Sequence, residues 1–188
     1  MRSPGIAVSI QYLAVTGNLG FNDIAAANDA ARQAYAEGAD IVFAAAGDAG
    51  LGVFAAAAET TAPGGPPRWA IGVDSDQYET VDDNPANVDA PRWRAHILTS
   101  VLKRTDVAVH DIVSRFANGD RLPRLQVYGV QNKGTAVAYS GGYLNDLRPT
   151  IETWRDRLAQ RDVVAPCTPL DRHTLAAQRG LPPDYCTI

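Results

Sequence analysis

The stretch "ADIVFAAAGDAGLGVFAAAAET", residues 39–60, decides which fold the sequence predicts. It opens with a near-continuous apolar run (39–45), as is typical of a parallel strand covered on both faces. A turn with three glycines follows, and residues 51–60 then have the composition of a helix. Strand, turn and helix in this order favour an α/β fold. The glycines predict that the main chain of the turn lies very close to a neighbour or a ligand.

The same alternation continues on both sides of this stretch. The segment "IAVSIQYLAV" (6–15) is β-branched and alternating, which is typical of a strand. A helix is predicted from an N-cap at Asn22 to about Glu37, and "RWAIGVD" (68–74) is predicted as a third strand. A β-α-β-α-β unit of this kind implies a parallel sheet whose ligands bind at the carboxyl ends of the strands.

The C-terminal half has a weaker pattern. Polar residues 76–93 are predicted as loop, and one long amphipathic helix is predicted over 94–118 because its apolar residues keep helical spacing. Two short strands (125–130 and 135–140), a last helix (150–160) and a Pro-rich tail complete the expected order of elements.

The composition argues against several classes of protein. The net charge is -4 and no basic cluster stands out, so a nucleic-acid surface is not expected. No apolar run approaches the roughly 20 residues that span a bilayer, and the N-terminus lacks the apolar core and cleavage site of a signal peptide. The two cysteines, Cys167 and Cys186, could pair in an oxidising compartment, but with His173 they make no metal motif.

All three predicted parallel strands end in polar, glycine-containing sequence: "GNLGFND", "AGDAGLG" and "GVDSDQ". The second does not match the spacing of a phosphate-binding loop, and Asp48 within it would repel a phosphate. Its glycines, Gly47 first among them, suit close main-chain approach to an uncharged, hydrogen-bonding ligand. A turn with a purely structural role explains them equally well.

Phe21 and Asp74 lie near these strand ends and are candidates for ligand contact. Phe21 precedes the predicted helix cap, where it could stack on a planar ring or pack on the first helical turn as a hydrophobic staple. Asp74 ends a strand, where its carboxylate could accept hydrogen bonds from hydroxyls or cap the next turn, a task that Asp76 could also perform. Lys103 is placed on the predicted long helix, where a solvated charge is the ordinary role of a lysine.

No enzyme active site emerges from the sequence. No histidine lies beside a plausible nucleophile, and Asp74 and Asp76 lack a partner acid or base. His96 and His110 are separated by nearly four turns of the predicted helix, so they could not share a metal. We therefore expect no catalytic residue, no metal and no cofactor.

Three blocks of sequence resemble the basic membrane lipoprotein family, the PnrA-like purine nucleoside-binding lipoproteins of ABC importers. They are "GADIVFAAAGDAGLGVFAAAAE" (38–59), "WAIGVDSDQ" (69–77) and "ILTSVLKRTDVAVHD" (97–111). The resemblance implies an α/β, type I periplasmic-binding-protein-like fold of two lobes that close on a nucleoside. Matched by motif, Phe21 would stack on the base, Gly47 would approach the ligand through its main chain, and Asp74 and Lys103 would bind the ribose.

The resemblance covers about residues 5–165 and implies a domain organisation. Residues 1–165 would form a partial solute-binding domain: 1–75 the second-lobe unit, 76–140 a segment crossing to and from the first lobe, and 141–165 a C-terminal helix. Residues 166–188 would be a tail. Most of the first lobe, the signal peptide and the lipid anchor of the family have no counterpart here. The helix predicted over 94–118 would therefore expose an apolar face and cause association.

The implied function is that of a solute-binding component on the outer face of the cell membrane, which delivers nucleosides to ABC permease subunits. The membrane would be reached only through a lipid anchor that is absent from this chain. The alternative is a ligand-sensing domain of a transcriptional or signalling regulator, because type I binding lobes serve there too. The sequence selects neither a particular nucleoside nor an oligomeric state.

Overall fold

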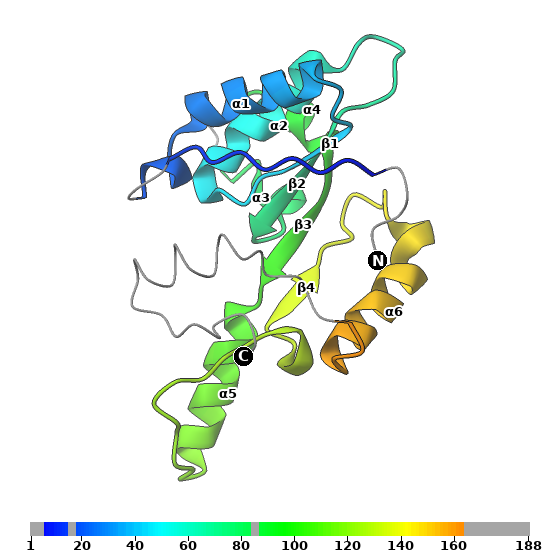
Figure 1. The fold of residues 1–188 in the computed structure, drawn as a ribbon. Helices are drawn as coiled ribbons and strands as arrows, with labels where there is room; N and C mark the ends of the chain where they lie inside the picture. The colour runs from blue at the N-terminus through cyan, green and yellow to red at the C-terminus, as the bar shows by residue number, and fades with distance from the viewer. Residues whose placement is uncertain (1–5, 15–17, 84–86, 164–188) are drawn as a thin grey trace. The chain divides into compact units, whose positions relative to one another are not determined.

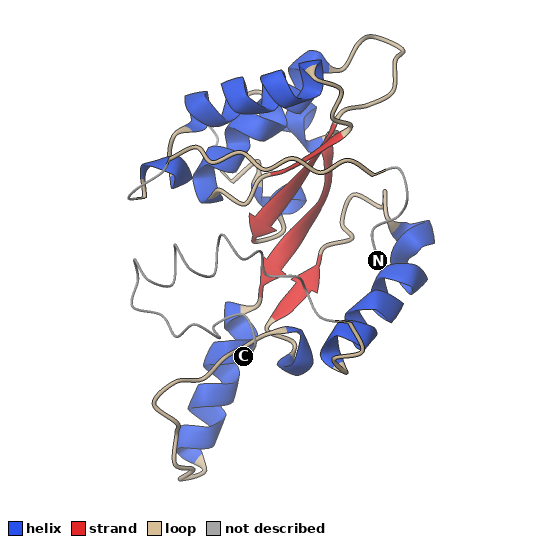
Figure 2. Ribbon diagram, in the orientation of Figure 1, coloured by secondary structure: helices blue, strands red, loops and turns tan. Residues whose placement is uncertain are grey.

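A four-stranded sheet lies at the centre of the first of the chain's two units, Met1–Arg148 and Pro149–Ile188. The computed structural model describes residues 6–14, 18–83 and 87–163 (Figure 1). The strands are β1 (Ile41–Phe43), β2 (Trp69–Asp74), β3 (Ile97–Lys103) and β4 (Thr135–Val137), in the order β1-β2-β3-β4. The first three are parallel and β4 is antiparallel to β3 (Figure 2). The α/β class and the mainly parallel sheet are confirmed.

Helices of very different length connect these strands. The long ones are α1 (Ile24–Ala36), α2 (Gly50–Thr60) and α5 (Thr105–Ala117), and the short ones are α3 (Gln77–Thr80) and α4 (Ala90–Arg94). Single turns of 3-10 helix occur at η1 (Leu19–Phe21), η2 (Gly47–Ala49), η3 (Val130–Asn132) and η4 (Asn145–Leu147). In the second unit, Arg157 of α6 (Arg148–Ala159) lies 4.4 Å from the centre of the Trp154 ring, one helical turn away.

The core of the first unit forms where α1 and α2 pack together beside β1 and β2 (Figure 1). Helix α2 is buried along most of its length, because alanines and glycines let neighbouring main chains come close. Phe54 of α2 is fully buried, and Asn28 Nδ2 of α1 donates a hydrogen bond of 3.1 Å to Gly52 O. This packing fixes the loop between β1 and α2 at the carboxyl end of the sheet.

The predicted strand-turn-helix unit is confirmed at 39–60 and 68–74, with small changes at the ends. The cap of α1 is Asp23 rather than Asn22, because Asp23 Oδ1 accepts a 2.9 Å bond from Ala26 N–H. The expectation that the strand predicted at 39–45 is covered on both faces is wrong. β1 is the edge strand, and Ile41 and Phe43 are about half exposed.

The single helix predicted over 94–118 is wrong. Residues 97–103 form β3 beside β2, and only residues 105–117 are helical. The apolar residues of "ILTSVLK" fit helical spacing, but they also suit a strand whose Ile97 and Ser100 are fully buried. Lys103 therefore ends a strand and does not lie on a helix.

Two predicted strands are not formed. The described part of the first, residues 6–14, is drawn as loop and belongs to no strand of the sheet (Figure 2). Its apolar side chains are exposed, for example Ile6 and Tyr12. Residues 125–130 are irregular and lead into η3, whereas the strand predicted at 135–140 is present as β4. A strand needs a neighbour for its main-chain groups, and these two segments have the composition without the neighbour.

The remaining expectations have mixed outcomes. The segment 76–93 is not all loop, because α3 and α4 lie within it, and the helix predicted at 150–160 is present as α6. Cys167, Cys186 and His173 lie outside the described residues. Within the described part of the chain, no helix combines the length and the apolar character that crossing a membrane requires.

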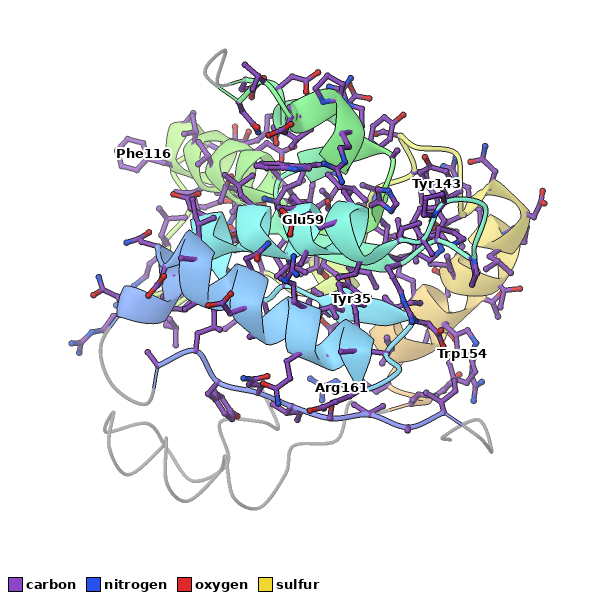
Figure 3. All side chains as sticks on the ribbon, turned by 90° about the horizontal axis from the view of Figure 1, so that it is seen from above. Tyr35, Glu59, Phe116, Tyr143, Trp154 and Arg161 are labelled. Atoms are coloured by element: carbon purple, nitrogen blue, oxygen red, sulfur yellow. The ribbon has the colours of Figure 1, made fainter. Side chains whose placement is uncertain are left out.

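The hydroxyl of Tyr35 is a buried link between α1 and the sheet. The residue is 2% exposed and its hydroxyl donates a 2.8 Å bond to Trp69 O (Figure 3). Burial raises the pKa of Tyr35 well above its usual value, and Arg68 opposes the shift. Because the pKa of Tyr35 is higher in the folded chain than in the unfolded chain, its contribution to stability is complete below the unfolded pKa of about 10. This contribution is lost as the pH rises above that value.

We expect Tyr35→Phe to lower the free energy of unfolding by about 1 kcal/mol at neutral pH, because one buried hydrogen bond is lost. The same variant should lose less stability than the parent chain as the pH rises above about 10, since no hydroxyl remains to ionise. Urea unfolding followed by circular dichroism at neutral and alkaline pH measures both effects. An equally steep alkaline loss in the variant would rule out Tyr35 as its source.

Candidate functional site

Phe21 and Gly47 meet at the carboxyl end of β1. Gly47 opens η2 directly after this strand and has a φ of 55°, which favours glycine. A Cβ placed on Gly47 would lie 3.6 Å from Phe21 Cδ1 and 3.5 Å from Phe21 O, so the main chain of Gly47 packs against Phe21. The side chain of Phe21 remains 51% exposed. It is therefore free to contact a planar group, and it does not act as a staple directly before the cap, since the cap is Asp23.

Asp74 and Lys103 form an ion pair at the carboxyl ends of β2 and β3. Asp74 lies beside Leu102 in the parallel register, so the next residue, Lys103, comes within reach. Lys103 Nζ lies 2.8 Å from Asp74 Oδ1. The placement of Lys103 on a strand thus produces a contact that the predicted helix would not have allowed.

All four predicted site residues lie at one edge of the sheet, in two pairs. Phe21 packs on Gly47, and Asp74 pairs with Lys103. Gln77 lies near both pairs, because its Oε1 accepts a 2.8 Å bond from Val73 N–H and would lie 4.0 Å from a Cβ built on Gly50. This edge is where parallel α/β sheets bind ligands.

The Asp74–Lys103 pair is open to solvent, with 51% of the Asp74 side chain and 64% of the Lys103 side chain exposed. An exposed ion pair is screened by water and contributes little to stability. Its oxygens and its ammonium can therefore take partners from a ligand at small cost. Together they offer acceptors and a donor, which suits neighbouring hydroxyl groups.

The next residue, Arg104, is already occupied. Its guanidinium makes a bidentate contact with Asp106, with Arg104 Nη2 2.7 Å from Asp106 Oδ2. The hydrogen bond from Arg104 lowers the pKa of Asp106 to about 2. Arg104 N–H also donates to Gly134 O at 2.9 Å, which ties the end of β3 to the start of β4. The charge of Arg104 is therefore neutralised beside the candidate site.

Sequence analysis does not identify the residues whose hydrogen bonds hold the turn that follows Asp74. Gln77 N–H donates to Ser100 Oγ at 3.1 Å, and Ser140 Oγ donates to the carboxylate of Asp76. Asp76 occupies the N-cap position of α3 but makes no capping bond with its side chain. The one available signal was Gly72, since a glycine inside a strand often marks a close approach of another group.

A shallow depression of about 700 Å³ lies at the opposite, amino end of the strands. It is lined partly by Arg32, Glu59 and Arg68. Arg32 pairs with Glu59 at 2.6 Å, and Arg68 donates to Ala39 O at 2.7 Å. We assign the candidate site to the carboxyl edge, because parallel α/β sheets bind ligands there and the four predicted site residues lie there. Among residues 6–14, 18–83 and 87–163, no three metal-ligating side chains come together.

Comparison with known proteins gives a family match over most of the first unit. Residues 5–140 match the family model described as ABC transporter substrate-binding protein PnrA-like. That description is of a binding protein, in agreement with the expectation that the chain is not an enzyme. The match covers the three blocks from which the resemblance was inferred.

Individual relatives are longer than this chain. A CD4+ T-cell-stimulating antigen of Listeria monocytogenes is 29% identical over 174 residues, which cover 89% of this chain and 45% of that protein. Basic membrane protein D of Borreliella burgdorferi is 32% identical over 111 residues, 59% of this chain and 26% of that protein. The chain thus spans at most about half the length of the curated relatives it matches.

A solved structure supports the fold. The solute-binding protein of an ABC transporter system from Aeropyrum pernix K1 superposes with a TM-score of 0.59 at 18% identity. The matched region is 87% of this chain and 50% of that one. At this level of identity the likeness concerns the arrangement of helices and strands.

Proposed function

The chain belongs to the family of PnrA-like ABC transporter substrate-binding proteins, and from this membership we propose that it binds a nucleoside for import. The ligand class is a neutral purine nucleoside. The base stacks on Phe21, the main chain at Gly47 lies against the ligand, and the ribose hydroxyls bind Asp74 and Lys103. These four residues are the ones that the family resemblance assigns to ligand binding.

The observation that carries the proposal is that an exposed aromatic ring, Phe21, and an exposed ion pair, Asp74–Lys103, lie at the same carboxyl end of the strands. A nucleoside presents a flat ring at one end and two adjacent hydroxyls at the other. Asp74 accepts hydrogen bonds from hydroxyls, Lys103 donates to their oxygens, and Phe21 offers a stacking face. A phosphate is disfavoured, because Asp48 lies in the first turn of η2 and Asp74 adds a second negative charge.

The wider role follows from the family. The protein acts as the solute-binding component of an importer, closes by a hinge around its ligand, and delivers it to ABC permease subunits on the outer face of the cell membrane. Membrane attachment in such a protein is through a lipid anchor. No observation favours the regulatory alternative over transport.

The test is a calorimetric titration of the chain with adenosine, guanosine and free ribose. Asp74→Ala should weaken nucleoside binding about 10- to 100-fold, because a hydrogen bond to a charged group contributes about 1.5–3 kcal/mol. The control is Asp40→Ala, since Asp40 lies before β1 at the other end of the sheet and its side chain is 90% exposed. Equal nucleoside affinity in Asp74→Ala and the parent chain would contradict the role given to the carboxylate.

A further inference from the structure

The main chain at Asp74 is in a strained conformation. Its φ is 69°, in the left-handed region that non-glycine residues seldom adopt. Ser75 N–H donates a 2.8 Å bond to Val73 O across it, which makes Asp74 the central residue of a γ-turn with positive φ. Such strain persists only where surrounding contacts hold the turn in place.

Gln77 supplies those contacts on one side. Its Oε1 accepts a 2.8 Å hydrogen bond from Val73 N–H, the residue before Asp74. Its own main-chain N–H donates to Ser100 Oγ at 3.1 Å. Ser100 is fully buried on β3, so this link attaches the turn to the interior of the sheet.

Gly72 has no side chain, which leaves room for Gln77 beside Val73 and Ser100. Gly72 lies opposite Ser100 in the register of β2 and β3. A Cβ on Gly72 would lie 2.4 Å from Gln77 Oε1 and 2.8 Å from Ser100 Oγ. Any side chain at this position would displace the amide of Gln77 from Val73.

The other side of the turn is held by Asp76. One of its carboxylate oxygens accepts the bond from Ser140 Oγ, which follows β4. The other, Asp76 Oδ1, is buried and has no hydrogen-bond partner within the described residues. The turn is thus fixed at Val73 by Gln77 and at Asp76 by Ser140, with Asp74 exposed between them.

We infer that Gln77 is a positioning residue, which holds the strained turn so that the carboxylate of Asp74 stays on Lys103 and faces the ligand. The inference deepens the proposed function and rests on it for its consequence in binding, but the hold on Asp74 is a property of the unliganded chain. Without the amide oxygen, Val73 N–H loses its partner and the turn can relax to an extended conformation. Asp74 then turns away from Lys103, whose own strand is unchanged.

The experiment compares Gln77→Leu with Gln77→Glu, which keeps an acceptor at the same place, and with Gln160→Leu, a matched exchange in the second unit. The first readout needs no ligand: the intraresidue amide-to-Hα NOE of Asp74, which is strong only at positive φ. We expect Gln77→Leu to reduce this NOE to the level of the extended residue Val73. Gln77→Glu and Gln160→Leu should leave it strong.

The second readout is the affinity for adenosine, which should fall about tenfold in Gln77→Leu and recover in Gln77→Glu, as expected for a buried donor left unpaired. An Asp74 NOE that stays strong in Gln77→Leu would overturn the inference, whatever the stability of that variant. A weakened NOE together with no adenosine binding by the parent chain would support the positioning role and contradict the proposed nucleoside site. The two failures are therefore distinguishable.

Discussion

Gly52→Ala is expected to lower the free energy of unfolding by about 3 kcal/mol or more, the range of severe overpacking. A Cβ at this position would lie 2.1 Å from Ile24 O and 2.8 Å from Asn28 N, both main-chain atoms of α1. No rotamer change relieves a clash with main chain, so α1 and α2 would have to separate. Alanine favours a helix over glycine by about 1 kcal/mol, which is too little to offset the clash.

Gly50→Ala in the same helix is the matched control. Its added Cβ would lie no closer than 3.4 Å, to Ala44 Cβ, which is an ordinary contact. We expect this variant to be within about 0.5 kcal/mol of the parent chain or slightly more stable. Urea unfolding followed by circular dichroism gives both values. If Gly52→Ala were as stable as the parent, the close approach of α1 to α2 described here would be wrong.

This packing explains why the first half of the fold could be predicted from the sequence. Each of the elements at 24–36, 50–60 and 69–74 has a local signal: a capping residue, an alanine-rich run or an apolar strand bounded by turns. These signals agree with the tertiary contacts the elements make. The carboxyl edge of the sheet, and with it Gly47 and Asp74, then follows from the parallel arrangement alone.

Prediction failed where the decisive information lies in a neighbouring strand. The residues of β3 fit helical and strand spacing alike, and β2 beside them selects the strand. Residues 6–14 have the composition of a strand, but the sheet edge at β1 is not paired with them. Motif resemblance predicts Phe21, Gly47, Asp74 and Lys103 as site residues, whereas it does not predict Gln77. Its role depends on a hydrogen bond from its main-chain N–H to the hydroxyl of Ser100, 23 residues further along the chain, which no local pattern encodes.

Association of the chain through α5 is the second large effect that we expect. Three apolar residues lie one turn apart along this helix and are exposed: Val109 at 62%, Val113 at 60% and Phe116 at 75%. Figure 3 shows the ring of Phe116 pointing away from the ribbon. Leu125, in the segment that follows, is 75% exposed. No residue of α5 is buried. An exposed apolar surface of this kind promotes self-association and binding of apolar dyes.

The double variant Val113→Lys with Phe116→Lys should therefore bind several-fold less anilinonaphthalene sulfonate and shift the light-scattering mass toward the monomer. The control is Ala117→Lys with Asn118→Lys, which adds the same charge to exposed positions of α5 and its cap but keeps the apolar face. Because neither pair touches the core, both variants should unfold at the same urea concentration as the parent. A parent chain that is monomeric and binds no dye would show that this face is covered in solution. Equal loss of association in both double variants would instead assign the effect to charge.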